Sequence, residues 1–424
     1  MSSKVNVAII GLGPRAETLL ASFCHISDVE VVAVCDLSTE RIDLITSILV
    51  KNGKPTPKAF LNYREMLQCE EIEAVFVPTS WNSHLSIATD CLNAGKYVAI
   101  EVGGAASIDE LWQLVCASER TGTPCMMLEN CCYARNELMI LNMVRQGLFG
   151  EIIHCEGGYE HCLLDDHFGN METCYRERNY HNVYRNGDLY PTHGLGPIAK
   201  ILHINRGNRF LSLTSTASKS RSAQAYRKKL AEQGAPVDPM ITFNEGDMIT
   251  TVIKCANGET ITLTHSISLP RPYSRNGRVQ GTEGIWLEDS NGIYVAGRSR
   301  DESLIDAAGN PYMNHYWDRV EDYYEEYDHP VWKDYKDRQF GGHNGIDALA
   351  ILAFLDAVRN HTNTPIDVYD VAAWMAVTCL SEQSIAIGSA PVPFPDFTNG
   401  KWVCREPEPM SRWALDDVYK ECFE

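Results

Sequence analysis

The sequence has no hydrophobic run long enough to cross a membrane and no excess of positive charge. Its 424 residues include 37 lysines and arginines against 56 aspartates and glutamates, which gives a net charge of −19 at neutral pH. Nucleic acids and anionic membranes attract positive surfaces, so this balance argues against both as partners. The apolar stretches also fall well short of the roughly 20 residues that a transmembrane helix needs.

Cysteine is plentiful, but it lacks the spacing of metal sites and disulfide-rich proteins. There are 15 cysteines, with no Cys-x-x-Cys pair and no zinc-ligand spacing, so no metal site is predicted. Several fall in expected strands or helices, where reduced thiols pack as small apolar side chains. The first strand follows Met1-Ser2-Ser3-Lys4 directly, which leaves no room for an export signal. These features predict a cytoplasmic location.

A Gly-x-Gly loop near the N-terminus is the most informative motif. An apolar strand over 5–10 leads into Gly11 and Gly13, a helical stretch follows, and a second apolar strand over 29–35 ends at Asp36. Gly11 permits a tight turn, and Gly13 lets backbone N–H groups approach a pyrophosphate at the helix N-terminus. Asp36 can accept hydrogen bonds from a ribose hydroxyl and would repel a 2′-phosphate. The pattern therefore predicts NAD rather than NADP; the alternative is a plain βα turn with a solvated aspartate.

Strands and helices alternate as far as residue 149. Strands are expected over 72–77, 97–101 and 125–129, and helices over 81–93, 107–120 and 133–146. This alternation is typical of a parallel sheet covered on both faces, whose ligands bind beyond the carboxyl ends of the strands.

The pattern changes at residue 150, where strand-like segments become dominant. Asn257-Gly258 is a hairpin signal between two of them. The segments are 151–160, 210–217, 248–256, 259–267, 282–288 and 292–296, with helices expected near 192–204, 344–361 and 370–386. The predicted fold is α/β: an NAD-binding Rossmann domain with a parallel sheet over residues 1–149, and a substrate-binding, catalytic α+β domain with a mostly antiparallel open sheet over 150–424.

An aromatic-rich stretch over 311–335 allows more than one interpretation. Its tyrosines, tryptophans and acidic residues could stack on a sugar or form a subunit contact. Aromatic-rich loops are also common surface features, and a solvated irregular segment is the favoured interpretation.

The domain order resembles the superfamily of glucose-fructose oxidoreductase, inositol dehydrogenase and rhizopine-catabolism proteins. Dehydrogenases of that superfamily carry Glu-Lys-Pro after the fifth strand, and the lysine helps catalysis. This chain has Glu101-Val102-Gly103-Gly104 there. A narrower resemblance, to the NAD-dependent α-N-acetylgalactosaminidases of glycoside hydrolase family 109, accounts for the missing lysine. The similar segments are 101–105, 127–130, 142–151, 185–194, 204–210, 270–275 and 394–398.

The resemblance implies a set of site residues. With Gly11, Gly13 and Pro14 of the loop, the NAD contacts would be Arg15, Asp36, Trp81, His84, Glu101, Val102 and Asn130. The substrate contacts would be Tyr159, Arg178, Tyr190, Pro191, Thr192, His193 and Tyr273. The chain departs from the family in lacking the twin-arginine export signal of many relatives, and in the less familiar segment 162–182, which contains Arg178.

The family's reaction, as the resemblance implies it, is hydrolysis through a transient oxidation. Hydride leaves C3 of the sugar for NAD, the C2 proton is removed, the aglycone leaves C1, water adds, and the hydride returns. His193, with an ordinary pKa near 6.5, suits proton transfer at O3. Tyr159, an ordinary phenol with a pKa near 10, could remove the C2 proton only with help from a nearby positive charge. Tyr190, one helical turn before His193 if this segment is helical, is the third catalytic candidate, and Tyr273 could stack on the sugar.

Structural explanations compete with several of these roles. Tyr159 could simply pack in its strand, and Trp81 and His84 could pack at the start of a helix. Glu129 could be a buried acid behind the site or a ribose contact. Asp188 could cap the following helix.

The predicted function is therefore an NAD-dependent glycosidase, with α-N-acetylgalactosaminides as the expected substrates. The main alternative is a sugar 3-dehydrogenase that releases NADH. A glycosidase with another linkage or sugar preference and a non-enzymatic NAD sensor are further alternatives. The expected partners are a small glycoside substrate and, by resemblance, a second copy of the chain paired through the open face of the second sheet.

Overall fold

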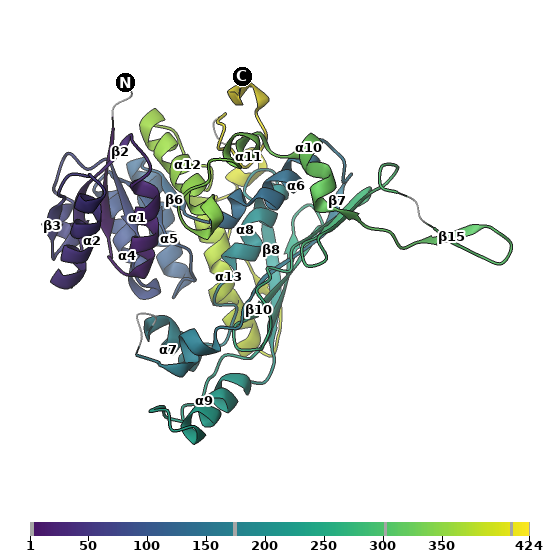
Figure 1. Ribbon diagram of the computed structural model, residues 1–424, viewed down its shortest axis with the longest axis horizontal. Helices are drawn as coiled ribbons and strands as arrows, with labels where there is room; N and C mark the ends of the chain where they lie inside the picture. Colours follow the sequence, from purple (N-terminus) through teal and green to yellow (C-terminus); the bar gives the residue numbers. More distant parts are fainter. Residues whose placement is uncertain (1–3, 173–175, 301–302, 408–409, 424) are drawn as a thin grey trace.

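The computed structural model describes residues 4–172, 176–300, 303–407 and 410–423. Two sheets dominate the molecule, one in each half of the chain, and helices α12 and α13 lie between them (Figure 1). None of the helices in the described ranges combines the length and the apolar character that crossing a bilayer requires.

The first sheet has six parallel strands in the order β3-β2-β1-β4-β5-β6. Its strands are β1 (Val5–Ile10), β2 (Val29–Cys35), β3 (Lys58–Phe60), β4 (Ala74–Val77), β5 (Tyr97–Ile100) and β6 (Cys125–Met127). Its helices are α1 (Pro14–Phe23), α2 (Thr39–Lys51), α3 (Tyr63–Met66), α4 (Trp81–Asn93) and α5 (Ile108–Thr121), and the 3-10 turn Asn130–Tyr133 then leads into α6 (Arg135–Arg145). This order is that of a dinucleotide-binding Rossmann fold, which confirms the predicted fold class.

The second sheet has nine strands in the order β16-β13-β12-β11-β7-β10-β9-β8-β17. They are β7 (Ile152–Glu160), β8 (Phe210–Ala217), β9 (Ile249–Cys255), β10 (Thr260–Ser266), β11 (Arg278–Gly281), β12 (Gly284–Leu287), β13 (Gly292–Val295), β16 (Asp318–Arg319) and β17 (Val392–Pro393). Only β7 and β10 pair in parallel, so the prediction of a mostly antiparallel sheet is confirmed. The β9–β10 hairpin turns at the predicted Asn257-Gly258.

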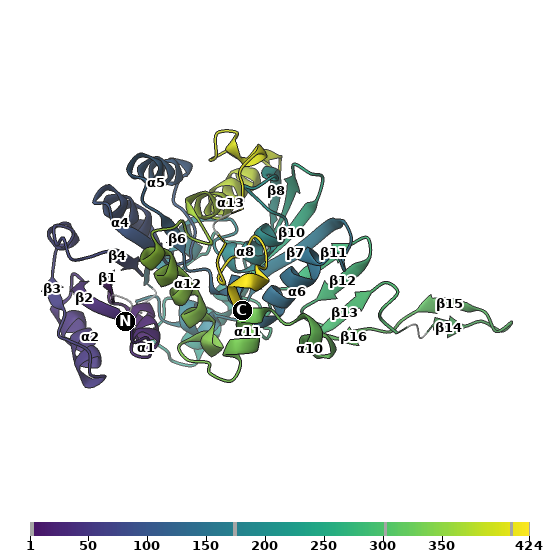
Figure 2. The same cartoon turned by 90° about the horizontal axis from the view of Figure 1, so that it is seen from above.

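In the part of the chain that the structure describes, helices α8 (Thr192–Ile201) and α13 (Val368–Ala386) pack on the second sheet. Helix α8 packs on β7, and α13 packs on β8. Along β9 the residues alternate between buried and exposed, as expected for a strand with one covered face. The hairpin of β14 (Ser303–Ile305) and β15 (Pro311–Asn314) projects away from the body (Figure 2).

The remaining helices lie at the edges and between the sheets. They are the π-helical turn Leu164–Gly169, α7 (Arg176–Tyr184), α9 (Ser222–Glu232), α10 (Tyr324–Tyr327), α11 (Pro330–Tyr335) and α12 (Ile346–Asn360).

Helix α12 packs against α1 and β1, and the Phe354 ring lies 5.1 Å from Phe76 of β4. A helix from beyond residue 150 thus covers the first sheet, and the boundary at 149/150 stays a prediction.

The interpretation of 311–335 as a solvated irregular segment is wrong for most of its length. Val320, Tyr327 and Trp332 are buried in the main core. Trp332 donates its indole N–H to the Tyr133 backbone oxygen at 2.9 Å. Composition did not reveal this burial, because large aromatic side chains with polar tips suit both an exposed loop and a core with available backbone acceptors.

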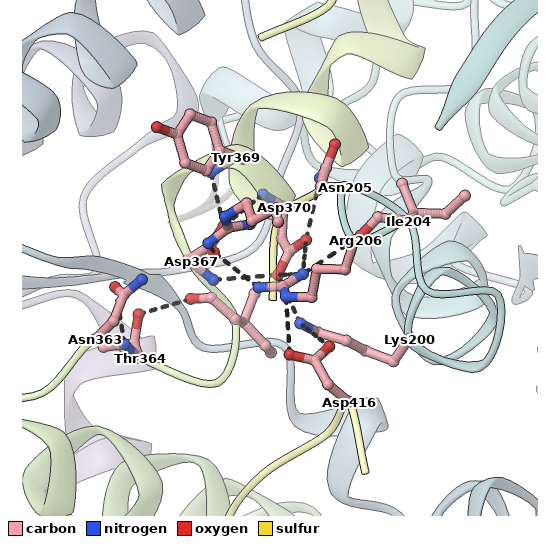
Figure 3. A network of polar contacts seen from close by, with 12 residues as sticks. Lys200, Ile204, Asn205, Arg206, Asn363, Thr364, Asp367, Tyr369, Asp370 and Asp416 are labelled. Atoms are coloured by element: carbon pink, nitrogen blue, oxygen red, sulfur yellow. Dashed lines mark hydrogen bonds and ion pairs between the residues drawn. The ribbon is translucent and has the colours of Figure 1, made fainter. Parts of the chain in front are cut away.

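A buried cluster of charged side chains fixes the far end of α8 (Figure 3). Arg206, just after the helix, contacts Asp367 at 2.7 Å, Asp370 at 3.0 Å and Asp416 at 2.8 Å. Lys200 of α8 donates to Asp370 at 2.6 Å. The cluster thereby ties α8 to the start of α13 and to the C-terminal segment, and the catalytic candidate His193 is the second residue of α8.

Candidate active site

One cavity of about 850 Å³ connects the glycine loop of the first domain with the surface of the second sheet. Its wall includes most of the predicted site residues. These are Gly11, Gly13, Pro14, Arg15, Asp36, Trp81, Glu101, Val102, Asn130, Tyr159, Arg178, Tyr190 and His193. The predicted cofactor and substrate residues therefore border a common space.

The glycine-loop end of the cavity fits a dinucleotide. Gly11 has a φ of +89°, and a Cβ there would lie 2.6 Å from the Thr79 side chain, so only glycine suits this position. Helix α1 begins at Pro14 without a side-chain cap, and the N-terminus of a helix favours an anion such as a pyrophosphate. Asp36 follows β2, and its carboxylate accepts from the Leu12 N–H at 2.6 Å and the Ser38 N–H at 2.9 Å. These bonds fix the carboxylate beside the loop, where a ribose is expected.

Replacing Asp36 by alanine is expected to weaken NAD binding about tenfold or more and to reduce the discrimination against NADP. The reason is the loss of a charged hydrogen-bond acceptor and of a negative charge that repels a 2′-phosphate. Fluorescence titration with NADH and NADPH measures both effects. Glu40→Ala is the matched control, because Glu40 is a nearby exposed carboxylate that bonds only the Ser38 hydroxyl. An unchanged preference in Asp36→Ala would refute the ribose contact.

Two of the expected NAD residues, Arg15 and Asn130, converge on Asp347, which the sequence analysis did not identify. Arg15 donates to Glu101 at 2.7 Å and to Asp347 at 2.8 Å, and Asn130 donates to Asp347 at 2.7 Å. Burial raises the pKa of Asp347, but the His343 and Arg15 contacts lower it further, so its pKa lies well below the ordinary value. Asp347 is therefore a permanent anion that orients the groups around it.

The His193 imidazole at the other end of the cavity is held by a buried carboxylate. Its Nδ1 lies 2.7 Å from Oε1 of Glu129, which follows β6 and is fully buried. Burial lowers the pKa of His193, but the neighbouring Cys131 and Glu129 raise it to well above the ordinary value. A histidine whose Nδ1 is bonded to a carboxylate keeps Nε2 for proton transfer. Of the two alternatives for Glu129, the structure favours the buried acid behind the site.

Tyr159 stands next to His193 because α8 and β7 approach very closely. A Cβ on Gly194 would lie 2.2 Å from the Gly158 backbone nitrogen, so no side chain fits between them. The Tyr159 ring centroid lies 5.7 Å from His193 and 4.6 Å from Tyr190. Burial, together with Tyr190, raises the pKa of Tyr159 to about 12, although His193 and Arg178 act in the opposite direction. Tyr159 is therefore a neutral phenol at pH 7 in this arrangement.

Tyr190 contacts His193, but not by the expected geometry. Helix α8 begins at Thr192 after Pro191, so Tyr190 precedes the helix and the argument from one helical turn is wrong. Its ring centroid still lies 4.9 Å from that of His193. Asp188 does not cap α8; it accepts from the Tyr190 N–H at 3.3 Å instead.

The other predicted residues take different positions. The Arg178 guanidinium lies over the Trp81 ring at 4.5 Å and the Tyr190 ring at 5.1 Å, so α7 brings it to the cavity. Tyr273 is half exposed, with its ring centroid 5.2 Å from that of His161, which borders the cavity.

Four predicted residues, Tyr273, His84, Pro191 and Thr192, are not part of the cavity wall. His84 is fully buried, and burial lowers its pKa to about 4. Pro191 and Thr192 are buried at the start of α8. Their predicted contacts with NAD or the substrate stay predictions.

His343 is a cavity residue that the sequence analysis missed. Its Nδ1 lies 2.8 Å from Oδ2 of Asp347, which repeats the pairing of His193 with Glu129. It belongs to the stretch Gly341-Gly342-His343-Asn344-Gly345, just before α12. A glycine-rich stretch that holds a histidine next to a helix was the available signal.

The fold and the site define an NAD-binding enzyme with the architecture of sugar and inositol dehydrogenases. Residues 5–128 match the model of the oxidoreductase family with an NAD-binding Rossmann fold. Residues 133–404 match the model of the glycosyl hydrolase 109 C-terminal domain. The chain therefore belongs to glycoside hydrolase family 109, and it is a glycoside hydrolase that uses NAD.

Curated relatives extend over nearly the whole chain. An α-N-acetylgalactosaminidase of Tannerella forsythia is 41% identical, over 95% of this chain and 88% of the relative. One of Shewanella oneidensis is 39% identical, over 95% and 87%.

Solved structures share the fold at low sequence identity. Levoglucosan dehydrogenase in complex with NADH aligns with a TM-score of 0.67 at 16% identity, over 93% of this chain and all of that one. Scyllo-inositol dehydrogenase of Lactobacillus casei with NAD(H) and scyllo-inositol aligns with a TM-score of 0.61 at 13% identity, over 92% and 99%.

Proposed function

We propose that the protein hydrolyses α-N-acetylgalactosaminides by transient oxidation at C3 of the sugar. The observation that carries this proposal is the meeting of His193 and Tyr159 in the cavity that begins at the glycine loop. Relatives of about 40% identity with α-N-acetylgalactosaminidase names support the choice of sugar. Val102, in place of the catalytic lysine of the dehydrogenases, supports hydrolysis over net oxidation.

His193 is the group that we assign to the 3-hydroxyl. When bound, NAD accepts hydride from C3 and later returns it. His193 Nε2 takes the hydroxyl proton during the oxidation and gives it back during the reduction. The Glu129 carboxylate stabilises the imidazolium in between, since it lies 2.7 Å from Nδ1.

Tyr159 is the group that we assign to the C2 proton. With a pKa raised to about 12 by burial and Tyr190, the phenol is too weakly acidic to act as a base at pH 7 unaided. Once His193 has taken the O3 proton, it is a cation close to Tyr159, and its charge favours the phenolate. The oxidation step thereby prepares the base for the elimination step.

A panel of nitrophenyl glycosides with and without added NAD tests the function. We expect p-nitrophenyl α-N-acetylgalactosaminide to release nitrophenolate over many turnovers without net NADH. Deuterium at C2 is expected to exchange with solvent or to slow the reaction, because the C2–H bond breaks during elimination. NADH accumulating in proportion to the sugar, without aglycone release, would make the protein a sugar 3-dehydrogenase. Full retention of the label would exclude the elimination.

We further propose that two copies pair through the uncovered face of the second sheet. Val252 on this face is 41% exposed, and Thr262 and Thr214 are its neighbours across the strands. Sedimentation velocity should give the mass of a dimer, and Val252→Glu should dissociate it because a charge would be buried. Leu44→Glu on exposed α2 is the control. A wild-type monomer at micromolar concentration would refute the pairing.

We also propose a cytoplasmic location. The cysteines in the described ranges are all free thiols, as expected in a reducing compartment. Cell fractionation of the native host tests the location, and recovery in the exported fraction would refute it.

A further inference from the structure

Three potential metal ligands of different chemistry meet beside the catalytic histidine. Within the described ranges, Glu129, Cys131 and His193 form a group whose ligand atoms all lie within 4.8 Å of one another. Glu129 and Cys131 come from the end of β6 and the turn after it, and His193 comes from the start of α8. A carboxylate, a thiol and an imidazole thus converge from two elements.

Two of the three side chains, those of Glu129 and Cys131, are buried and shielded from water. Glu129 is fully buried and Cys131 is 4% exposed, whereas His193 borders the cavity. Oε1 of Glu129 bonds His193, but Oε2 is buried without a hydrogen bond of satisfactory geometry. Burial raises the pKa of Glu129, but His193 and the Thr192 hydroxyl lower it to below the ordinary value. Glu129 therefore contributes a buried carboxylate to a group whose ligand atoms lie within 4.8 Å of one another.

The donor set matches the preferences of zinc and of similar soft divalent cations. Zinc binds thiolate, imidazole and carboxylate at about 2.0–2.3 Å, and three protein ligands with one open position are typical of sites next to a cavity. The present separations require the side chains to close in slightly around the ion. The cavity beside His193 offers the fourth position to water or to a sugar hydroxyl.

We propose that Glu129, Cys131 and His193 bind a zinc-like divalent cation, and that this binding reversibly inhibits the enzyme. The inhibitory part rests on the proposed function, because it requires His193 as the base for O3. On binding, the cation displaces the thiol proton of Cys131 and the proton between His193 and Glu129, and both protons pass to water. No electrons are transferred. With His193 ligated, the imidazole is no longer available for the 3-hydroxyl, so turnover stops until the cation leaves.

Cobalt(II) absorption tests the site without any need for turnover. We expect the purified protein to bind cobalt in a 1:1 ratio, with a thiolate-to-cobalt charge-transfer band in the near ultraviolet. Cys131→Ala is expected to lose this band and to weaken cobalt and zinc binding at least about tenfold, since a ligand is removed. Cys132→Ala is the matched control, because Cys132 is an equally buried neighbour outside the group.

Zinc inhibition of nitrophenyl glycoside hydrolysis tests the consequence. Zinc is expected to inhibit the wild type and Cys132→Ala, with recovery after addition of a chelator. Cys131→Ala is expected to need at least about ten times more zinc for the same fractional inhibition of its own zinc-free activity.

The outcomes separate this inference from the proposed function. Absence of the cobalt band, or a band of equal strength in Cys131→Ala, overturns the metal site whatever the enzyme does. Equal zinc sensitivity of Cys131→Ala and the wild type overturns the inhibition. A protein that binds cobalt as expected but hydrolyses no glycoside overturns the proposed function and leaves the metal site intact.

Discussion

The His193→Ala enzyme should lose at least about two orders of magnitude in kcat while it still binds NAD. General acid–base catalysis contributes about a hundredfold to ten-thousandfold, and this imidazole is assigned to two proton transfers in each turnover. NAD binding should persist, because Gly11 and Asp36, the predicted contacts of the dinucleotide, line the other end of the cavity. Turnover of the nitrophenyl glycoside and fluorescence titration with NADH measure the two quantities separately.

Glu129→Gln is the informative companion to His193→Ala. The Glu129 charge helps to raise the pKa of His193, so its removal lowers that pKa. His193 must be neutral to accept the O3 proton, so the activity should rise with pH through the pKa of His193. In Glu129→Gln this rise in activity should occur at a lower pH, because the pKa of His193 is lower. Near wild-type activity of His193→Ala, or an unchanged pH profile of Glu129→Gln, would contradict these assignments.

Arg206→Met should destabilise the fold by about 3–5 kcal/mol, the cost of leaving buried charges without their partner. Arg206 is almost completely buried and contacts Asp367, Asp370 and Asp416 (Figure 3). Its removal takes away a cation that all three buried aspartates share, although Lys200 still pairs with Asp370 and Arg405 with Asp367. Urea-induced unfolding followed by tryptophan fluorescence gives the change in the free energy of unfolding.

Arg64→Ala is the surface control for Arg206→Met. Arg64 pairs with Asp90 at 2.8 Å, but it is largely exposed, so its loss should change the stability by less than about 1 kcal/mol. Similar losses in the two variants would mean that the buried cluster contributes no more than an ordinary surface pair.

Sequence patterns predicted the elements whose cause is local. The strand-like segments predicted at 151–160, 210–217 and 248–256 match β7, β8 and β9 to within one residue at each end. The glycine loop and Asp36 predicted the nucleotide site, since both lie at one strand-turn-helix unit. The burial of 311–335 escaped prediction because an aromatic side chain with a polar tip carries no signal of its surroundings.

The sequence by itself determined the NAD-binding fold and the family of the second domain, and it identified His193 and Tyr159 as candidates, because these depend on short motifs. Only the tertiary structure decided which charged side chains contact these site residues. Glu129 lies 64 residues from His193 along the chain, and Asp347 lies 332 residues from Arg15. The group of Glu129, Cys131 and His193 has no metal-binding spacing, which is why the sequence predicted no metal site. Two elements distant in sequence bring these ligands together through packing, and no linear pattern records a distance set by packing.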